Sequence, residues 1–238
     1  MASITPISHC FWRGARNALP FLLVILPFGA LFGVAATDAG LDLAEVMGFS
    51  ILVLAGASQF TALQLMNDHA PAFMVIVTSL AVNLRMAMYS VSLAPHLGRA
   101  APWHRVLIAY LMTDQSFGLS QQEYERAPAM SLPQKVAYFL GACLPTCLPW
   151  SLSTLAGALA GKAIPEGLAL DFAVPVTFLA MIAPGLRSVP HLAAATVSVI
   201  AALALSPLPT GTGLLLAALL AMWTGATVER LLERRNAA

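Results

Sequence analysis

The stretch "AFMVIVTSLAVNLRMAMYSVSLA", residues 72–94, decides the class of fold. It is apolar along its whole length except for Asn83, Arg85 and a few hydroxyl side chains. A helix needs about 20 mostly apolar residues to cross the hydrocarbon core of a bilayer, which is roughly 30 Å thick. Residues 72–94 therefore predict a membrane span that carries a guanidinium group within it.

The composition of the whole chain agrees with a membrane location. Of its 238 residues, 59% are hydrophobic and 10% are charged, and the mean hydropathy is +0.80. A soluble domain carries about 25% charged residues, so we expect an integral protein of the lipid bilayer. The formal net charge of +1 offers no electrostatic basis for binding nucleic acid.

Apolar runs long enough to cross a bilayer recur along the sequence, separated by charged residues, prolines or glycines. They predict an all-α fold, a polytopic transmembrane helical bundle, with residues 1–238 forming a single integral membrane domain. Eight spans are expected, and seven is the alternative because only Arg187 and Pro190 mark one boundary. The runs are approximately 18–37, 46–66, 72–94, 102–121, 134–160, 168–186, 190–206 and 211–228.

The first run follows two arginines, a flank that also suits a signal peptide, but it is longer than the apolar part of one. We therefore expect a retained first span. With eight spans, the side that holds both termini carries most of the Lys and Arg residues, which marks the cytoplasmic side. That side holds Arg13, Arg16, Arg126, Lys135, Arg187, Arg230, Arg234 and Arg235, and the other holds Arg99, Arg105 and Lys162.

Two segments, residues 19–45 and 144–173, resemble each other weakly. Both open with Leu-Pro, contain a second proline and carry two glycines four residues apart. Either this similarity is chance, or it is an internal repeat of the kind found in transporters. Four full spans between the copies would make the repeat parallel, and one re-entrant segment would make it inverted. The prolines Pro27 and Pro149 also allow broken helices that are buried in protein or line a cavity.

The segment "LAGASQFTALQLM", residues 54–66, places polar side chains in an apolar run. Ser58 and Thr61 are three residues apart and so share one face of a helix, and Gly56 and Gln59 lie beside them. Such a cluster either holds helices together through small residues and hydrogen bonds or lines a cavity that binds a polar substrate.

Two charged residues lie deep within separate apolar runs. Arg85 lies in the run quoted above, and Asp114 lies in "LMTDQSFGLS", residues 111–120. Each costs roughly 2.5–3.5 kcal/mol at the centre of a bilayer, so each needs a partner. If the chain turns back near Gly98, the two residues lie about 20 and 24 Å from the turn, at 1.5 Å per helical residue. The sequence therefore predicts an ion pair between them.

Asn83 and Arg85 point to different faces of a straight helix, whereas Tyr89 shares the face of Arg85. A span that is polar on two faces is either packed centrally or interrupted near Asn83. The ion pair either only fixes helix register, or it opens to bind a substrate. In the second case Arg85 holds a carboxylate bidentately, and Asp114 holds an ammonium group or a proton. Such a site suits the zwitterion of an aliphatic α-amino acid.

The sequence lacks the motifs of several enzyme classes. It has no Walker A loop, no HExxH zinc motif and no GxSxG nucleophile motif, so we expect no enzymatic activity, no catalytic residue and no cofactor. The three cysteines, Cys10, Cys143 and Cys147, show neither a disulfide framework nor a zinc spacing. We expect them to pack as small apolar residues, and we expect no metal site.

Four segments taken together resemble the AzlC family, the large subunit of bacterial branched-chain amino acid exporters. The resemblance covers about residues 15–230 and is specific in the first half of the chain. The segments that carry it, in order, are "PFGALFG" (27–33), "LAGASQFTAL" (54–63), "NLRMAMYSVSL" (83–93) and "LMTDQSFGL" (111–119).

The resemblance implies a transport domain that exports branched-chain or other hydrophobic amino acids across the bacterial inner membrane, together with a small membrane partner of the AzlD type. The alternative is a structural or regulatory subunit whose partner holds the substrate site. One departure is Met86, because relatives often have a histidine there, so a proton relay through that position would differ here. The expected substrate-binding or coupling residues are Gly56, Ser58, Gln59, Thr61, Asn83, Arg85, Tyr89 and Asp114.

Overall fold

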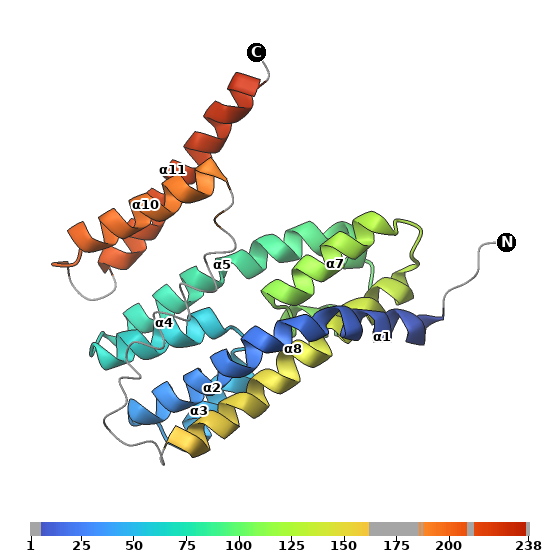
Figure 1. The fold of residues 1–238 in the computed structure, drawn as a ribbon, viewed down its shortest axis with the longest axis horizontal. Coiled ribbons are helices and arrows are strands. Elements are labelled where there is room, and N and C mark those ends of the chain that lie inside the picture. Colours follow the sequence, from blue (N-terminus) through green and yellow to red (C-terminus); the bar gives the residue numbers. More distant parts are fainter. Residues whose placement is uncertain (1–5, 162–185, 187, 209–211, 237–238) are drawn as a thin grey trace. The chain divides into compact units, whose positions relative to one another are not determined.

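The computed structural model describes residues 6–161, 186, 188–208 and 212–236, and the elements it describes there are helices, as the all-α prediction requires (Figure 1). They are α1 (Ile7–Ala18), the short 3-10 helix η1 (Leu19–Phe21), α2 (Leu22–Asp38), α3 (Leu43–Leu52), α4 (Gly56–Asn67), α5 (Ala72–Leu97), α6 (Pro102–Tyr110), α7 (Asp114–Arg126), α8 (Leu132–Gly161), α10 (Val189–Ala204) and α11 (Thr212–Asn236).

Four stretches of helix in the described part of the chain are long and apolar enough to cross a membrane. The expected count of seven or eight spans is therefore not confirmed, and the run expected over 168–186 lies outside the described residues except for residue 186. The four stretches are Ile7–Asp38, Ala72–Leu97, Leu132–Gly161 and Thr212–Arg235.

The chain divides into two compact units, and both α4 and α5 pass from one unit into the other. One unit comprises Met1–Phe60 and Val82–Leu168, and the second comprises Thr61–Ala81 and Ala169–Ala238. In the second unit α10 and α11 pack along each other, with Gly225 of α11 near Ala194 of α10. The expectation of a single domain stays a prediction. Arg85, Tyr89 and Asp114 belong to the first unit.

The single helix expected over 46–66 is two short helices that reverse direction. Phe49 of α3 and Phe60 of α4 both lie against the ring of Phe32 in α2, at centroid separations of 6.3 and 5.3 Å. In one straight helix these two residues would lie about 16 Å apart along the axis. The chain therefore turns back at 53–55, and α3 and α4 form a helical hairpin.

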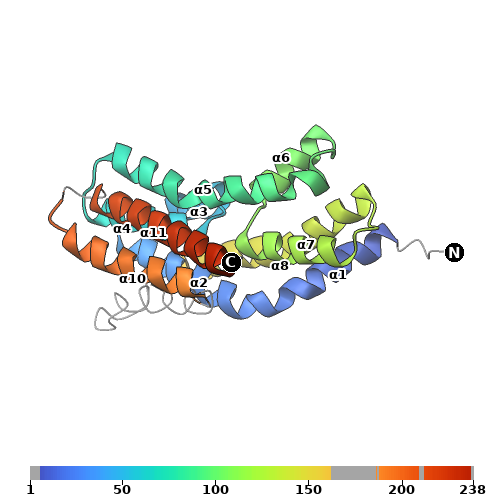
Figure 2. The same cartoon turned by 90° about the horizontal axis from the view of Figure 1, so that it is seen from above.

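The helix expected over 102–121 reverses in the same way. Asp114, at the start of α7, contacts Arg85 of α5, whereas Tyr124 near the end of α7 lies 5.2 Å from His96 between ring centroids. Because α7 runs in the same direction as α5, α6 must return between them. The break at 111–113 makes α6 and α7 a second hairpin, at the end of the unit where α1 begins (Figure 2).

The helix formed by α1, η1 and α2 packs parallel to α8, and glycines bring the two backbones together. A Cβ atom on Gly14 would lie 2.2 Å from the Tyr138 carbonyl oxygen, and one on Gly157 would lie 2.0 Å from that of Ala30. Both helices thus advance in the same direction along the contact. Of the two arrangements considered for the similar segments, 19–45 and 144–173, their described parts adopt the parallel one.

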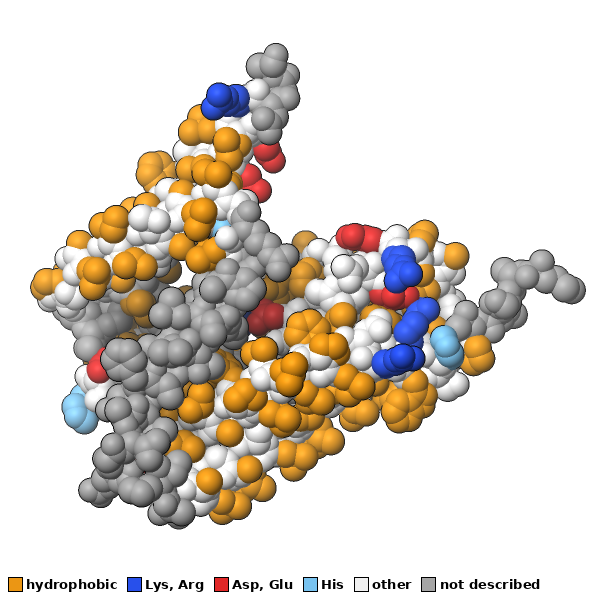
Figure 3. All heavy atoms as spheres, in the orientation of Figure 1, with side chains coloured by type: hydrophobic (Ala, Val, Ile, Leu, Met, Phe, Trp, Pro, Cys, Tyr) orange, Lys and Arg blue, Asp and Glu red, His pale blue; other side chains and the backbone are white. Residues whose placement is uncertain are grey.

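Lys and Arg residues gather at one end of the first unit, where α1 and α8 begin and α5 and α7 end (Figure 3). Because α3 and α4 reverse at 53–55 instead of crossing as one span, α5 runs back to this end and places Arg99 and Arg105 here too, which corrects their expected assignment to the opposite side. The end of α2 and the start of α3, at the far end of the unit, carry Asp38, Asp42 and Glu45. The basic residues gathered here are Arg13, Arg16, Arg99, Arg105, Arg126 and Lys135.

Replacing Gly33 with alanine is expected to destabilise the first unit by about 1–3 kcal/mol, the usual cost of overpacking. The added Cβ would lie 2.1 Å from the Thr154 carbonyl oxygen and 2.6 Å from the Ala158 nitrogen, so α2 and α8 would have to separate. Gly48→Ala is the matched control, because a Cβ there meets no atom within 4 Å. The midpoint of thermal unfolding in detergent measures both variants, and equal midpoints would contradict the packing described.

Candidate functional site

The predicted ion pair between Arg85 and Asp114 is present in the first unit. Arg85 Nη2 lies 3.2 Å from Asp114 Oδ2, and the Tyr89 hydroxyl donates a 2.9 Å hydrogen bond to Asp114 Oδ1. The two charged side chains are 30% and 40% exposed. The pair is therefore only partly covered by the described residues and is not sealed within the core of the first unit.

The local sequence explains why Asp114 points to α5. Asp114 is the first residue of α7, and the side chains of Thr113 and Ser116 form a capping box that starts this helix. The helix N-terminus carries a partial positive charge, which stabilises a carboxylate there. One turn later, Phe117 stacks on the Tyr89 ring at a centroid separation of 4.0 Å. These contacts fix the carboxylate between α5 and α7.

Polar atoms on two faces of α5 have unused hydrogen-bonding capacity. Arg85 Nε and Asn83 Oδ1 are buried and, within the described residues, make no hydrogen bond. α5 is an unbroken helix over these positions, so the alternative of an interruption near Asn83 is wrong. The guanidinium therefore has a second edge that can bind an additional acceptor.

The first polar cluster, by contrast, stabilises the hairpin of α3 and α4. The Gln59 side chain is fully buried, and its Nε2 donates to the Phe49 carbonyl oxygen at 2.9 Å and to the Val53 carbonyl oxygen. Gly56 lies against the rings of Trp150 and Phe28. For these two residues the structure favours helix packing over a cavity wall.

For Ser58 and Thr61, the expected role in substrate binding or coupling stays a prediction. Ser58 is buried in the first unit, at the start of α4. Thr61 belongs to the second unit. The contacts that place Arg85, Tyr89 and Asp114 together are therefore the ones on which a site can be built.

Polar side chains also cap the backbone groups that the helix breaks expose. The hydroxyl of Tyr110, the last residue of α6, donates to the Ile51 carbonyl oxygen at the end of α3. The thiols of Cys143 and Cys147 donate to the Leu111 carbonyl oxygen at 3.3 and 3.7 Å. An uncapped carbonyl in a membrane costs several kcal/mol, so these contacts stabilise the two breaks.

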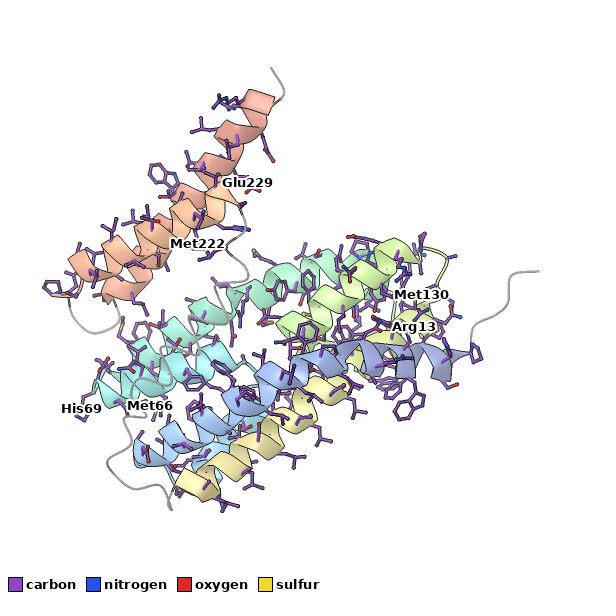
Figure 4. All side chains as sticks on the ribbon, in the orientation of Figure 1. Arg13, Met66, His69, Met130, Met222 and Glu229 are labelled. Atoms are coloured by element: carbon purple, nitrogen blue, oxygen red, sulfur yellow. The ribbon has the colours of Figure 1, made fainter. Side chains whose placement is uncertain are left out.

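The far end of α7 is anchored at the basic end of the unit. Glu123 Oε1 lies 2.6 Å from Arg13 Nη2, and the same arginine nitrogen contacts Met130 Sδ at 3.8 Å (Figure 4). The Tyr124 hydroxyl donates to the Lys135 carbonyl oxygen at 2.8 Å. Burial raises the pKa of Tyr124, so its hydroxyl stays protonated and keeps donating. Both ends of α7 are thus fixed by side-chain contacts.

Comparison with known proteins places these residues in a family. The family model described as AzlC protein matches residues 20–164, more than half of the chain. The inner membrane protein YgaZ of Escherichia coli (strain K12) is 26% identical, over 94% of this chain and 96% of its own. An uncharacterized membrane protein of Archaeoglobus fulgidus is 30% identical, over 92% of this chain and 97% of its own. No solved structure matches the chain significantly.

Proposed function

This chain belongs to the AzlC family of membrane proteins, and on that premise we propose that it is the membrane subunit of a secondary exporter of branched-chain or other hydrophobic amino acids. The observation that carries the proposal is the accessible ion pair of Arg85 and Asp114 at the tip of the α6–α7 hairpin. A permanent structural pair has no need to be exposed, whereas a binding site does.

The two charges match the two ends of an amino acid. The guanidinium of Arg85 binds the substrate carboxylate, for which its planar fork is well suited. The carboxylate of Asp114 binds the ammonium group. A zwitterion that enters therefore replaces one ion pair with two, so neither Arg85 nor Asp114 is left without a counter-charge when the pair opens.

The surroundings of the pair favour an apolar substrate side chain. Tyr89, Phe117, Met86 and Leu111 belong to the partly buried apolar shell of the core between α5, α7 and α8. A methionine and two aromatic rings offer contact to an aliphatic chain and no further charge. Leucine, isoleucine and valine fit this combination of charged and apolar groups.

The two helical hairpins, α3–α4 and α6–α7, support a role for this site in transport. The arms α3 and α6 have 10 and 9 residues, and such arms extend about 15 Å, half of a bilayer core. Breaks at that depth are tolerated where they are buried or line a cavity, and transporters bind substrates between broken helices near the membrane centre. The chain would act without a cofactor or enzymatic step, driven by the proton gradient or by the substrate gradient.

The location and the partner follow from the same proposal. The concentration of basic residues where α1 begins favours a cytoplasmic N-terminus by the positive-inside bias. The family resemblance and the Escherichia coli inner membrane relative support a location in the bacterial inner membrane. The family resemblance adds a small AzlD-type membrane subunit as its working partner.

The charge match predicts which analogues of leucine compete for the site. Unlabelled leucine is expected to displace labelled leucine from the purified protein in detergent. Leucinamide lacks the carboxylate and 4-methylpentanoate lacks the ammonium group, so each is expected to compete about 10- to 100-fold less well, the effect of one lost charged hydrogen-bonding group. Equal competition by all three compounds would contradict a site that binds both charges.

A further inference from the structure

The tips of the two hairpins are joined by one side-chain hydrogen bond. In an unbroken helix the Ile51 carbonyl oxygen would accept from the amide of Ala55. Here the Ala55 amide donates to the Val53 carbonyl oxygen instead, at 2.7 Å. The Ile51 oxygen is thereby freed at the end of α3, and the Tyr110 hydroxyl donates to it from the end of α6.

Tyr110 and Asp114 lie on either side of the same helix break. Tyr110 ends α6 and joins the tip to α3, whereas Asp114 begins α7 and joins the tip to Arg85 and Tyr89 of α5. The short segment 111–113 between them is therefore held from both sides. A movement of this tip away from α5 pulls on the contact with Ile51 as well.

We propose that Tyr110 is a gating residue for the site formed by Arg85 and Asp114, and this inference rests on the proposed function. The bond from Tyr110 to the Ile51 carbonyl oxygen holds the two hairpin tips together while Arg85 and Asp114 neutralise each other, which is the state without substrate. The bond breaks when a tip moves to open the site. Tyr110 thus sets how readily the empty site changes the side of the membrane that it faces.

The two hairpins enter the unit from opposite ends. α6 begins where the basic residues gather, and α3 begins beside Asp38 and Asp42 at the other end. Withdrawal of α6–α7 opens the site toward the basic end, and withdrawal of α3–α4 opens it toward the acidic end. The bond between Tyr110 and Ile51 lies where both movements begin, so either movement breaks it.

Tyr110→Phe tests the proposal, because it removes the hydroxyl and keeps the ring. Efflux of labelled leucine from proteoliposomes is measured with and without unlabelled leucine outside. Without external leucine, each transport cycle requires the empty site to turn back to the inside of the vesicle. The rate of net efflux therefore reports on the reorientation of the empty site. We expect net efflux to rise about 3- to 10-fold relative to exchange, the effect of one hydrogen bond on a barrier. An unchanged ratio would overturn the proposal.

Val106→Ala is the matched control. Val106 lies one turn before Tyr110 on the same face of α6 and is 71% exposed, so its truncation perturbs the helix without touching the bond. Its ratio of net efflux to exchange is expected to equal that of the parent. A rise as large as that of Tyr110→Phe would assign the effect to α6 in general and overturn the gating role.

Cross-linking gives a second test, which does not require the Tyr110→Phe variant to be obtained as folded protein. Cysteines replace Leu52 and Tyr110 and are joined by a cleavable bis-maleimide, with each single replacement as its control. We expect the cross-linked protein to lose exchange and to recover it when the linker is cleaved. Full exchange with the linker in place would show that the tips need not separate. Absence of leucine exchange by the parent protein itself would contradict the proposed function rather than the gate.

Discussion

Replacing Arg85 with lysine is expected to cause a large loss of leucine transport while the protein remains folded in the membrane. Lysine keeps the positive charge and can still pair with Asp114, which lies 3.2 Å from the guanidinium in the parent protein. It loses the fork that binds a carboxylate through two hydrogen bonds. We expect exchange to fall about 10- to 100-fold, the effect of one lost charged hydrogen bond.

Arg126→Lys is the control for this substitution, since Arg126 is exposed at the end of α7. Size-exclusion profiles of both variants in detergent report whether they fold. Exchange at the parent rate by Arg85→Lys would contradict the carboxylate-binding role. The double variant with alanine at positions 85 and 114 separates the structural alternative: if it is well expressed and transports at the parent rate, the pair only fixes helix register.

Replacing Asp114 with asparagine is expected to remove proton coupling before it removes exchange. The amide keeps an acceptor oxygen for the Tyr89 hydroxyl, which donates to Asp114 at 2.9 Å, and it keeps the side-chain volume. It can neither take up a proton nor carry a charge. We expect exchange to fall about 10- to 100-fold, because the charge that binds the ammonium group is lost. Transport driven by an imposed pH gradient is expected to fall at least about 10-fold further, because the proton-binding group is lost as well.

Glu125→Gln is the matched control, because Glu125 is an exposed carboxylate on the same helix. Transport driven by a pH gradient is compared with exchange at equal pH for the parent and both variants. If Asp114→Asn responds to the gradient as strongly as the parent protein, Asp114 is not the coupling residue, and coupling must involve another group.

The ion pair could be predicted from the sequence because the physics leaves few options. Arg85 and Asp114 are charged residues deep in apolar runs, and a charge in a membrane needs a partner. Their similar distance from the turn near Gly98 then makes them neighbours. The depth estimate remained useful although α6 and α7 do not form one helix, since α6 still carries the chain from that turn back to the level of Arg85.

The two reversals could not be predicted from apolar length. Two short apolar helices in succession contain as many apolar residues as one span, so a search for runs of about 20 residues counts them as one. A local signal existed at the second break, because Thr113 and Ser116 have the spacing of a capping box. At the first break the cap is the side chain of Gln59, which bonds back to Phe49 and Val53.

The missed reversals also explain why Tyr110 was not among the predicted site residues. In a continuous helix Tyr110 is an ordinary aromatic residue of a span. Its bond to the Ile51 carbonyl oxygen exists only because α3 ends there and leaves that oxygen without its helical donor. The contact joins residues distant in the sequence, and neither residue has a side chain that signals the other.

Counterflow of labelled leucine into proteoliposomes tests most directly that Arg85 and Asp114 form an amino-acid transport site. Vesicles containing this chain, with and without its AzlD-type partner, are loaded with unlabelled leucine and diluted into labelled leucine. We predict transient accumulation of label that requires the internal leucine and is absent in Arg85→Lys. No accumulation of leucine or of another hydrophobic amino acid by the folded protein, alone or with its partner, would contradict the proposed site.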